Sequence, residues 1–354
     1  MNRILKGALA GYGLSGEVFH APFLAADPRF SLDWVWERST DRCRARYPEV
    51  KTVREYGALL DSDADFIVLG VPNALHVPLA EQAMRAGKHV VVEKPVTATA
   101  AEAEGLFAVA RETGRLLAVY QNRRWDGGYR TARRLVESGE LGEIVEWQGR
   151  YDRFTPVPRA GTWRAKEAWR ERGEPGVGTL YDLGSHLVDQ VVALFGAPEA
   201  VWADLAARRP GSEIDDDFVV HLFYPGMRAT LAATQMAAQP GPHLTVRGTR
   251  GSYVKERLDV QEAALKGGAA PGGPDWGRDD PADYGRLTAP GTDGMLRSQA
   301  VETLPGDYGL FYDALYRTLA GGEEFPVREE QVITVLRILE AAGESSRTGR
   351  KITL

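Results

Sequence analysis

The chain has 354 residues, 44% of them hydrophobic, so it is long enough for two domains and can bury a sizeable core. Its formal net charge of -6 and isoelectric point of about 5.7 argue against a broad nucleic-acid surface, because such surfaces need clustered lysines and arginines. Cys43 is the only cysteine, so neither a disulfide framework nor a metal site is expected. With no apolar run long enough to span a membrane and no signal-peptide pattern, we expect a cytoplasmic protein with a small-molecule partner.

The first 120 residues alternate predicted strands and helices. Strands are expected at residues 4–10, 31–36, 65–71, 89–92 and 116–120, and helices at 55–60, 78–86 and 97–113. The first strand is apolar on both faces, as in a parallel strand that helices cover on both sides. This alternation predicts a doubly wound parallel sheet, a Rossmann domain, in residues 1–122.

After residue 123 the predicted strands become longer and are joined by turns such as Tyr224-Pro225-Gly226. They are expected at residues 143–154, 200–206, 218–224, 227–236 and 244–247, with helices at 179–195, 308–319 and 330–342. Long strands with turn-type links indicate a large, mainly antiparallel open sheet. We therefore expect a second, α+β domain at 123–354, whose C-terminal helix can pack back on the first domain.

Residues 266–300 are rich in glycine, proline and aspartate and show no hydrophobic period. This composition predicts a long loop or flap. Such loops are uncommon inside compact domains and often have a function.

Gly11, Gly13 and Gly16 have the spacing G-x-G-x-x-G between the first predicted strand and a helical segment at 14–20. The spacing alone is a weak signal because 39 residues are glycine, but its place directly after a strand favours a nucleotide loop over a structural turn. The first glycine then permits a tight turn, the second lets a pyrophosphate approach, and the third lets helix and strand pack closely. We expect Leu14 and Ser15 to contact the same nucleotide.

The end of the second predicted strand carries the side chains that choose between NAD and NADP. Glu37 can accept a hydrogen bond from a ribose 2′-hydroxyl, which favours NAD. Arg38, Ser39 and Thr40 can hold a 2′-phosphate, which favours NADP. These signals conflict; NADP is mildly favoured, and NAD or a solvated Arg–Glu pair are the alternatives.

Two further groups carry chemistry. Glu93-Lys94-Pro95 follows a buried strand at the edge where ligands bind in open α/β sheets, and the proline restricts Lys94 to an extended conformation. Asp182 and His186 lie four residues apart on one face of the helix predicted at 179–195, where the histidine can transfer a proton near neutral pH. Gly184 costs ~1 kcal/mol relative to alanine inside a helix, which suggests that something approaches closely there. A solvated strand exit and a surface ion pair are the alternatives.

These segments together resemble the Gfo/Idh/MocA oxidoreductases over essentially the whole chain. The resemblance rests on GYGLSGEVFHAPFL, HVVVEKP, VYQNRRWD and GTLYDLGSHLVDQ, and is closest to the branch that includes NADP-dependent scyllo-inositol dehydrogenase. It implies hydride transfer between a polyol or sugar alcohol and the nicotinamide, in a homodimer or homotetramer built on the open sheet. A non-catalytic NAD(P)-binding regulator, or a glycosidase-like enzyme that uses bound NAD transiently, are alternatives. The segment from Phe19 to Pro22 is expected to interrupt the first helix, with His20 packed or capping rather than in contact with substrate.

The resemblance also implies roles for single residues. Lys94 matches the lysine that contacts the nicotinamide ribose and the substrate hydroxyl, His186 the proton acceptor, and Asp182 the residue that positions it. Further cofactor contacts are implied for Pro72, Asn73, His76, Glu93, Gln121, Trp169 and Arg170, and substrate contacts for Asn122, Arg123, Arg124, Tyr151 and Tyr181. Trp163-Arg164 repeats the Trp-Arg pair, so its register stays open.

Overall fold

The computed structural model describes residues 3–158, 171, 173 and 175–354. The chain forms two compact units. Unit 1 comprises Met1–Asn122, Gln261–Trp276 and Asp307–Val332, and unit 2 comprises Arg123–Val260, Gly277–Gly306 and Ile333–Leu354. The chain therefore passes repeatedly from one unit to the other.

Unit 1 is built on a six-stranded sheet in the order β3-β2-β1-β4-β5-β6, with every neighbouring pair parallel. The strands are β1 (Leu5–Ala10), β2 (Phe30–Trp36), β3 (Lys51–Val53), β4 (Phe66–Leu69), β5 (His89–Val92) and β6 (Leu117–Val119). The strand order reverses between β1 and β4, and ligands bind at such a switch point, outside the carboxyl ends of the strands. The predicted Rossmann sheet is confirmed.

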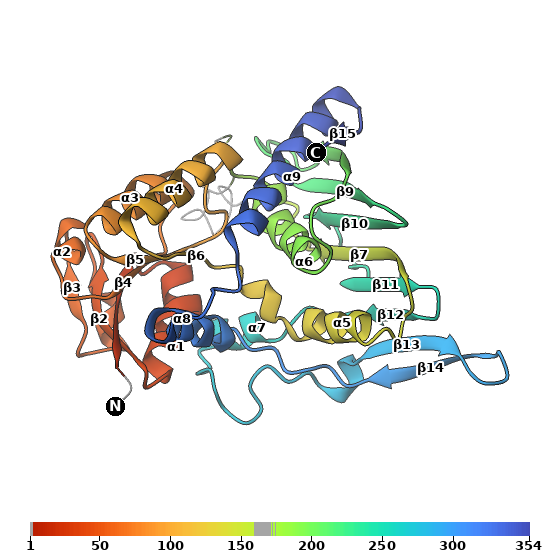
Figure 1. The fold of residues 1–354 in the computed structure, drawn as a ribbon, viewed down its shortest axis with the longest axis horizontal. Coiled ribbons are helices and arrows are strands. Elements are labelled where there is room, and N and C mark those ends of the chain that lie inside the picture. Colours follow the sequence, from red (N-terminus) through yellow and green to blue (C-terminus); the bar gives the residue numbers. More distant parts are fainter. Residues whose placement is uncertain (1–2, 159–170, 172, 174) are drawn as a thin grey trace. The chain divides into compact units, whose positions relative to one another are not determined.

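Helices cover both faces of this sheet (Figure 1). One face carries α3 (His76–Arg85) and α4 (Ala100–Thr113), and the other carries α1 (Ala21–Ala26) and α8 (Gly309–Gly321). The short helices α2 (Gly57–Leu60) and α7 (Gln261–Lys266) complete the unit. The start of α4 follows directly from its sequence, because Thr99 and Glu102 form a reciprocal capping box.

The segment after the glycine loop is a π-helix, Ser15–His20, that continues directly into α1. The expected interruption between Phe19 and Pro22 takes the form of an irregular residue, His20, with φ of -120° and ψ of -60°, and not of a break in the helical segment. The helix changes type at His20, and Pro22 lies in the first turn of α1, where its missing N–H needs no partner.

Unit 2 contains a nine-stranded sheet in the order β14-β13-β12-β11-β7-β10-β9-β8-β15. Its strands are β7 (Ile144–Asp152), β8 (Ala200–Ala206), β9 (Asp217–Tyr224), β10 (Met227–Thr234), β11 (Leu244–Gly248), β12 (Ser252–Lys255), β13 (Gly285–Pro290), β14 (Leu296–Val301) and β15 (Ile352–Thr353). Among the described strands of this sheet only β7 and β10 pair in parallel, so the predicted mainly antiparallel sheet is confirmed.

Three helices cover one face of the nine-stranded sheet: α5 (Gly127–Glu137), α6 (Ser185–Phe195) and most of α9 (Glu329–Thr348) (Figure 1). Alternate residues of β7 point toward them. Trp147 packs edge-on against Tyr129 of α5 and Phe195 of α6, and Gly149 leaves room for Leu187. The core of unit 2 lies between these helices and the sheet.

The expectation of a structureless loop at 266–300 is wrong in its second half. Gly285–Pro290 and Leu296–Val301 form the β13–β14 hairpin, visible at the lower right of Figure 1. Nearly every residue of β14 is exposed. A strand without a buried face has no alternation of apolar and polar residues, so its sequence carries no strand signal.

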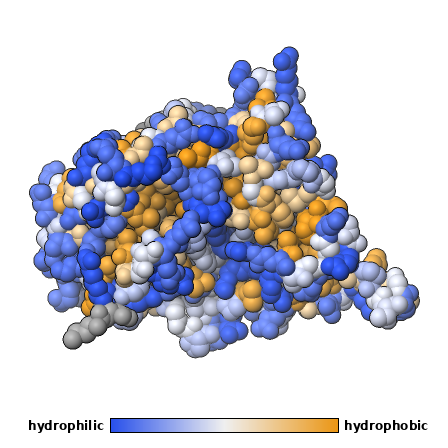
Figure 2. Space-filling model, in the orientation of Figure 1, coloured by the Kyte–Doolittle hydropathy of each residue, from blue (hydrophilic) through white to orange (hydrophobic). Residues whose placement is uncertain are grey.

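Within the described residues, no helix is long and apolar enough to cross a membrane. On the face visible in Figure 2, hydrophilic and hydrophobic residues are interspersed.

Candidate cofactor and catalytic site

The three glycines of the nucleotide loop differ in what surrounds them. Gly11 has a φ of +100°, and a Cβ there would lie 2.7 Å from the Gly70 carbonyl oxygen. A Cβ on Gly16 would lie 2.2 Å from the Gly11 carbonyl oxygen, whereas one on Gly13 would meet nothing within 4 Å. The fold itself therefore requires Gly11 and Gly16, while the open space at Gly13 fits the close approach of a phosphate to the backbone.

The other cofactor candidates of unit 1 follow the carboxyl ends of its strands. Pro72 and Asn73 come after β4, Glu93 and Lys94 after β5, and Gln121 after β6. Because these ends meet at one edge of a parallel sheet, the fold brings them to the edge that carries the glycine loop. The Gln121 side-chain oxygen is buried and has no hydrogen-bond partner among the described residues, as expected of a group that a bound nucleotide would satisfy.

The Glu93 carboxylate is held firmly at this edge. Its Oε1 lies 3.0 Å from His20 Nε2 and accepts a hydrogen bond from the Ser15 hydroxyl, and its Oε2 accepts the Lys94 backbone N–H at 3.2 Å. Burial would raise the pKa of this carboxyl, but the hydrogen bonds from His20 and Ser15 lower it to about 2. Glu93 is therefore an anion that braces the turn from which Lys94 projects.

His76 joins two turns of the same edge. It is completely buried, with Nδ1 2.9 Å from the Pro95 carbonyl oxygen and Nε2 3.1 Å from that of Val71. Burial lowers the pKa of this imidazole, while its hydrogen bonds to the two carbonyl oxygens act in the opposite direction. Because both nitrogens face the protein's own backbone, the expected direct cofactor contact is corrected to a supporting role.

The Glu37 carboxylate, expected to bind the ribose, accepts hydrogen bonds from its own loop. Glu37 is 5% exposed, and its carboxylate accepts hydrogen bonds from the Thr40 hydroxyl and from the N–H groups of Arg42 (3.2 Å) and Cys43 (2.9 Å). Burial would raise its pKa, but these donors lower it. Its neighbours Arg38 and Ser39 are exposed. The carboxylate that argued for NAD is thus used by its own loop.

In unit 2, Asp182 and His186 lie on the helix predicted to carry them. Leu180–Gly184 forms a π-helix that runs into α6, with Asp182 partly exposed and His186 6% exposed. The Asp215 carboxylate accepts the Leu180 N–H at 2.7 Å and thereby caps this helix. Burial raises the pKa of Asp215 to about 6.

Gly184 has a packing explanation. A Cβ there would lie 3.0 Å from both Leu180 Cδ1 and Phe218 Cζ, which is tighter than ordinary contact. The close approach expected at Gly184 is therefore made by the protein's own Leu180 and Phe218 side chains. The glycine lets this part of the helix pack on the sheet.

The segment after residue 122 is tied to α6. Arg124 forms a bidentate ion pair with Asp189, at 2.8 and 2.7 Å, and the Gln190 side chain donates to the Arg123 carbonyl oxygen at 2.9 Å. This ion pair uses Nε and Nη2 of the guanidinium and holds the segment on the helix; a substrate contact by Arg124 would have to use its other N–H groups.

Arg123 and Tyr151 are both buried and share Asp126. The Arg123 guanidinium lies 3.5 Å from one carboxylate oxygen of Asp126 and 5.7 Å above the Tyr151 ring, whose hydroxyl lies 3.4 Å from the other oxygen. Arg123, Tyr151 and Asp126 therefore form one buried polar cluster.

The remaining candidates add less. Leu14 and Pro72 are exposed, Asn122 is buried, and Tyr181 is partly exposed with its carbonyl oxygen accepting the Ser185 hydroxyl at 2.7 Å. Trp169 and Arg170, and the alternative pair Trp163-Arg164, lie outside the described residues.

Three residues with supporting roles were not assigned from the sequence: Asp189, Asp215 and Tyr312. Asp189 lies seven residues after Asp182, two turns along the same helix, and that spacing could have identified it. Asp215 and Tyr312 act on residues distant in the sequence, and no local pattern marks such contacts.

Comparisons with known proteins agree with this architecture. The family described as "Oxidoreductase family, NAD-binding Rossmann fold" matches residues 5–121, and "Oxidoreductase family, C-terminal alpha/beta domain" matches residues 133–354. The chain is 40% identical over 349 residues to the uncharacterized oxidoreductase YdgJ of Escherichia coli (strain K12), covering 98% of each chain. It is 37% identical over 352 residues to the scyllo-inositol 2-dehydrogenase (NADP(+)) IolW of Bacillus subtilis (strain 168), covering 99% of this chain and 96% of that protein.

Solved structures give the same result. The oxidoreductase yvaA from Bacillus subtilis superposes with a TM-score of 0.94 at 36% identity, covering 100% of this chain and 99% of that one. An oxidoreductase from Bacteroides fragilis gives a TM-score of 0.89 at 37% identity, covering 99% and 100%. With both domain families matched and relatives that span its full length, the chain belongs to the Gfo/Idh/MocA family of NAD(P)-dependent oxidoreductases.

Proposed function

We propose that this enzyme transfers hydride reversibly between a secondary alcohol of an inositol-like polyol or a sugar and NADP. The observation that carries the proposal is the Asp182–His186 pair, on a capped helix, in a chain that also has Lys94 at the cofactor edge of its Rossmann sheet. The substrate class is supported by the relative named as a scyllo-inositol 2-dehydrogenase.

In this proposal unit 1 residues hold the cofactor, which supplies the carbon that takes up the hydride. Its proposed ligands are Gly11, Gly13, Leu14, Ser15, Gly16, Arg38, Ser39, Pro72, Asn73 and Gln121. Lys94 orients the substrate hydroxyl and stabilises negative charge as it develops on that oxygen, His186 removes the hydroxyl proton, and Asp182 positions His186. Asn122, Arg123, Tyr151 and Tyr181 are proposed to contact the rest of the substrate. Residues 1–122 and 123–354 would then be the cofactor and substrate domains.

NADP is proposed over NAD because of Glu37. Its carboxylate is engaged by three donors of its own loop, while the cation Arg38 and the hydroxyl of Ser39 are exposed beside it. A 2′-phosphate needs such a cation, whereas a 2′-hydroxyl needs the carboxylate.

We also propose a cytoplasmic homodimer or homotetramer, built on the face of the nine-stranded sheet opposite its helices. On that face Trp202 stacks on His221 with ring centroids 5.5 Å apart, and Val219 and Phe223 are only partly covered. Light scattering would give the mass, and a monomer would exclude the proposal.

The proposed roles are tested with Lys94→Met and His186→Asn. His186→Asn should bind NADPH with the wild-type dissociation constant within about threefold. Lys94→Met loses the contact with the nicotinamide ribose that the resemblance implies, so it should still bind NADPH but about tenfold more weakly. Both variants should lose turnover by at least about a hundredfold. Cofactor fluorescence and steady-state kinetics give the two quantities. Full turnover by His186→Asn would remove His186 from the mechanism.

A further inference from the structure

A buried hydrogen-bonded chain runs from α8 to the Glu93–Pro95 turn, entirely within unit 1. The Tyr312 hydroxyl lies 2.6 Å from His20 Nδ1, and His20 Nε2 lies 3.0 Å from Glu93 Oε1. His20 is 0% exposed and Tyr312 is 1% exposed. The Tyr120 ring lies 4.4 Å from the imidazole, so the histidine is enclosed and both of its nitrogens are used.

The chemistry of these groups decides which of them donates and which accepts each hydrogen bond. An ionised carboxylate only accepts hydrogen bonds, so His20 Nε2 donates to Glu93. Burial raises the pKa of Tyr312, which keeps its hydroxyl protonated and able to donate to Nδ1. Glu93 in turn accepts the backbone N–H of Lys94. Each group thus orients the next one, and the row of hydrogen bonds ends at the backbone N–H of Lys94.

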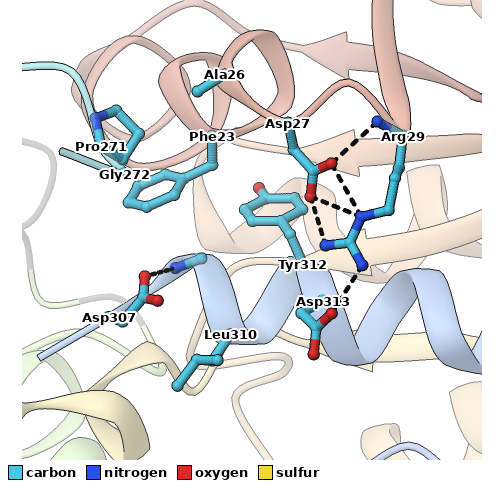
Figure 3. Close-up of a pocket in the computed structure, with 11 residues that line it drawn as sticks. Phe23, Ala26, Asp27, Arg29, Pro271, Gly272, Asp307, Leu310, Tyr312 and Asp313 are labelled. Carbon is cyan, nitrogen blue, oxygen red and sulfur yellow. Dashed lines mark hydrogen bonds and ion pairs between the residues drawn. The ribbon is translucent and has the colours of Figure 1, made fainter. Parts of the chain in front are cut away.

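Tyr312 is itself held in place by packing. It lines a cavity of about 380 Å³ beside Phe23 of α1, and the two rings stack with centroids 5.9 Å apart and planes 14° apart (Figure 3). Next to them Arg29 bridges Asp27 and Asp313, at 2.7 and 2.8 Å, and so ties α1 to α8 (Figure 3). The tyrosine hydroxyl therefore starts from a fixed position, as an orienting group must.

We propose that His20 and Tyr312 are positioning residues for the reaction: through Glu93 they fix the turn that presents Lys94. This inference rests on the proposed function. Neither residue needs to touch substrate or cofactor. Their effect falls on the placement of Lys94, and small errors in the placement of a reacting group are costly.

The test is Tyr312→Phe, with Tyr316→Phe as the matched control. Tyr316 lies one turn further along α8, is 9% exposed, packs on Phe30 and donates to the Arg3 carbonyl oxygen at 3.2 Å, with no link to Glu93 in the hydrogen bonds described. Both variants lose one buried hydroxyl and should lose similar stability. Tyr312→Phe should lower kcat about tenfold at unchanged polyol KM and weaken NADPH binding by about threefold, whereas Tyr316→Phe should change neither.

His20→Gln and His20→Leu complete the test. Glutamine can still donate an N–H toward Glu93 and should retain more kcat than leucine. Equal kinetic effects of Tyr312→Phe and Tyr316→Phe, in proportion to lost stability, would overturn the inference. If wild-type protein oxidises no polyol, the proposed function fails, and the NADPH dissociation constants of the same variants still decide the positioning role.

Discussion

Side chains at single positions decide whether the nucleotide loop can work. Gly13 and Gly16 belong to one motif, yet a Cβ would enter open space at the first and lie 2.2 Å from a carbonyl oxygen at the second. Gly13→Ala should therefore unfold at the wild-type temperature but bind NADPH at least about tenfold more weakly, because the methyl group occupies the phosphate's approach. Gly16→Ala should lower the unfolding temperature as well. Wild-type affinity in Gly13→Ala would show that no phosphate approaches there.

A second residue-scale prediction separates Arg38 from Glu37. Arg38→Ala should raise the KM for NADP by about tenfold and leave that for NAD unchanged, because the guanidinium is proposed to meet only the 2′-phosphate. Glu37→Gln should lower thermal stability, since it disturbs three hydrogen bonds in the loop, without changing the ratio of NADP to NAD activity. A selective loss of NAD activity in Glu37→Gln would restore it as a ribose ligand.

At single positions, the sequence predicted the backbone of the nucleotide loop but not the partners of its polar side chains. The glycine spacing predicted the loop correctly, although the fold itself requires only Gly11 and Gly16 and leaves open space beside Gly13. Glu37, His76 and Arg124 were predicted at a ligand edge, but the sequence could not show that their polar atoms face partners within the protein. Such partners, as Pro95 is for His76 and Asp189 for Arg124, follow from side-chain orientation.

At the scale of elements, the helix that carries Asp182 and His186 depends on its cap. Burial raises the pKa of Asp215 to about 6 from an ordinary value of 3.8. The folded state therefore holds this proton more tightly than the unfolded state, and the associated stability is full below pH 3.8 and is lost as the pH rises through 6. Asp215→Asn keeps an oxygen that can accept the Leu180 N–H but cannot ionise.

Asp215→Asn should consequently flatten the fall in the free energy of unfolding between about pH 4 and 6.5, measured by urea titration. Asp204→Asn, an exposed aspartate on β8, is the matched control and should leave that slope as in the wild type. Parallel pH profiles for Asp215→Asn and the wild-type protein would show that the pKa of Asp215 is not raised in the folded state.

Helices and strands could be predicted from the sequence where burial of one or both faces imposes a regular pattern of apolar residues. Every strand of unit 1 except β3 was expected, because most of their residues are apolar; β3 has only three residues. Helix α5 was missed because it begins with Gly127-Gly128, residues that disfavour helices. Close packing requires the first of them, since a Cβ on Gly127 would lie 2.4 Å from the Leu304 carbonyl oxygen. Both α5 and the exposed strand β14 depend on contacts with distant parts of the chain, which their own sequences do not reveal.

At the scale of the whole molecule, the change of rhythm near residue 123 indicated the two kinds of sheet correctly. What no local pattern showed is that Gln261–Trp276 and Asp307–Val332 return to unit 1. The second of these stretches contains α8, which supplies Tyr312 to His20 across 292 positions of sequence. Such contacts depend on how α8 packs in unit 1, and a pattern within a short stretch of sequence cannot predict them.

The most direct test of the account is a panel of inositols, aldoses and 1,5-anhydro sugars, each incubated with the purified protein and either NADP or NAD. We predict that NADPH accumulates in step with the oxidised product for at least one inositol-like polyol, that NADP is preferred to NAD, and that His186→Asn abolishes the signal. Cofactor binding without turnover would point to a regulatory protein, and product without net NADPH to transient use of the cofactor. Either result would contradict the proposed dehydrogenase.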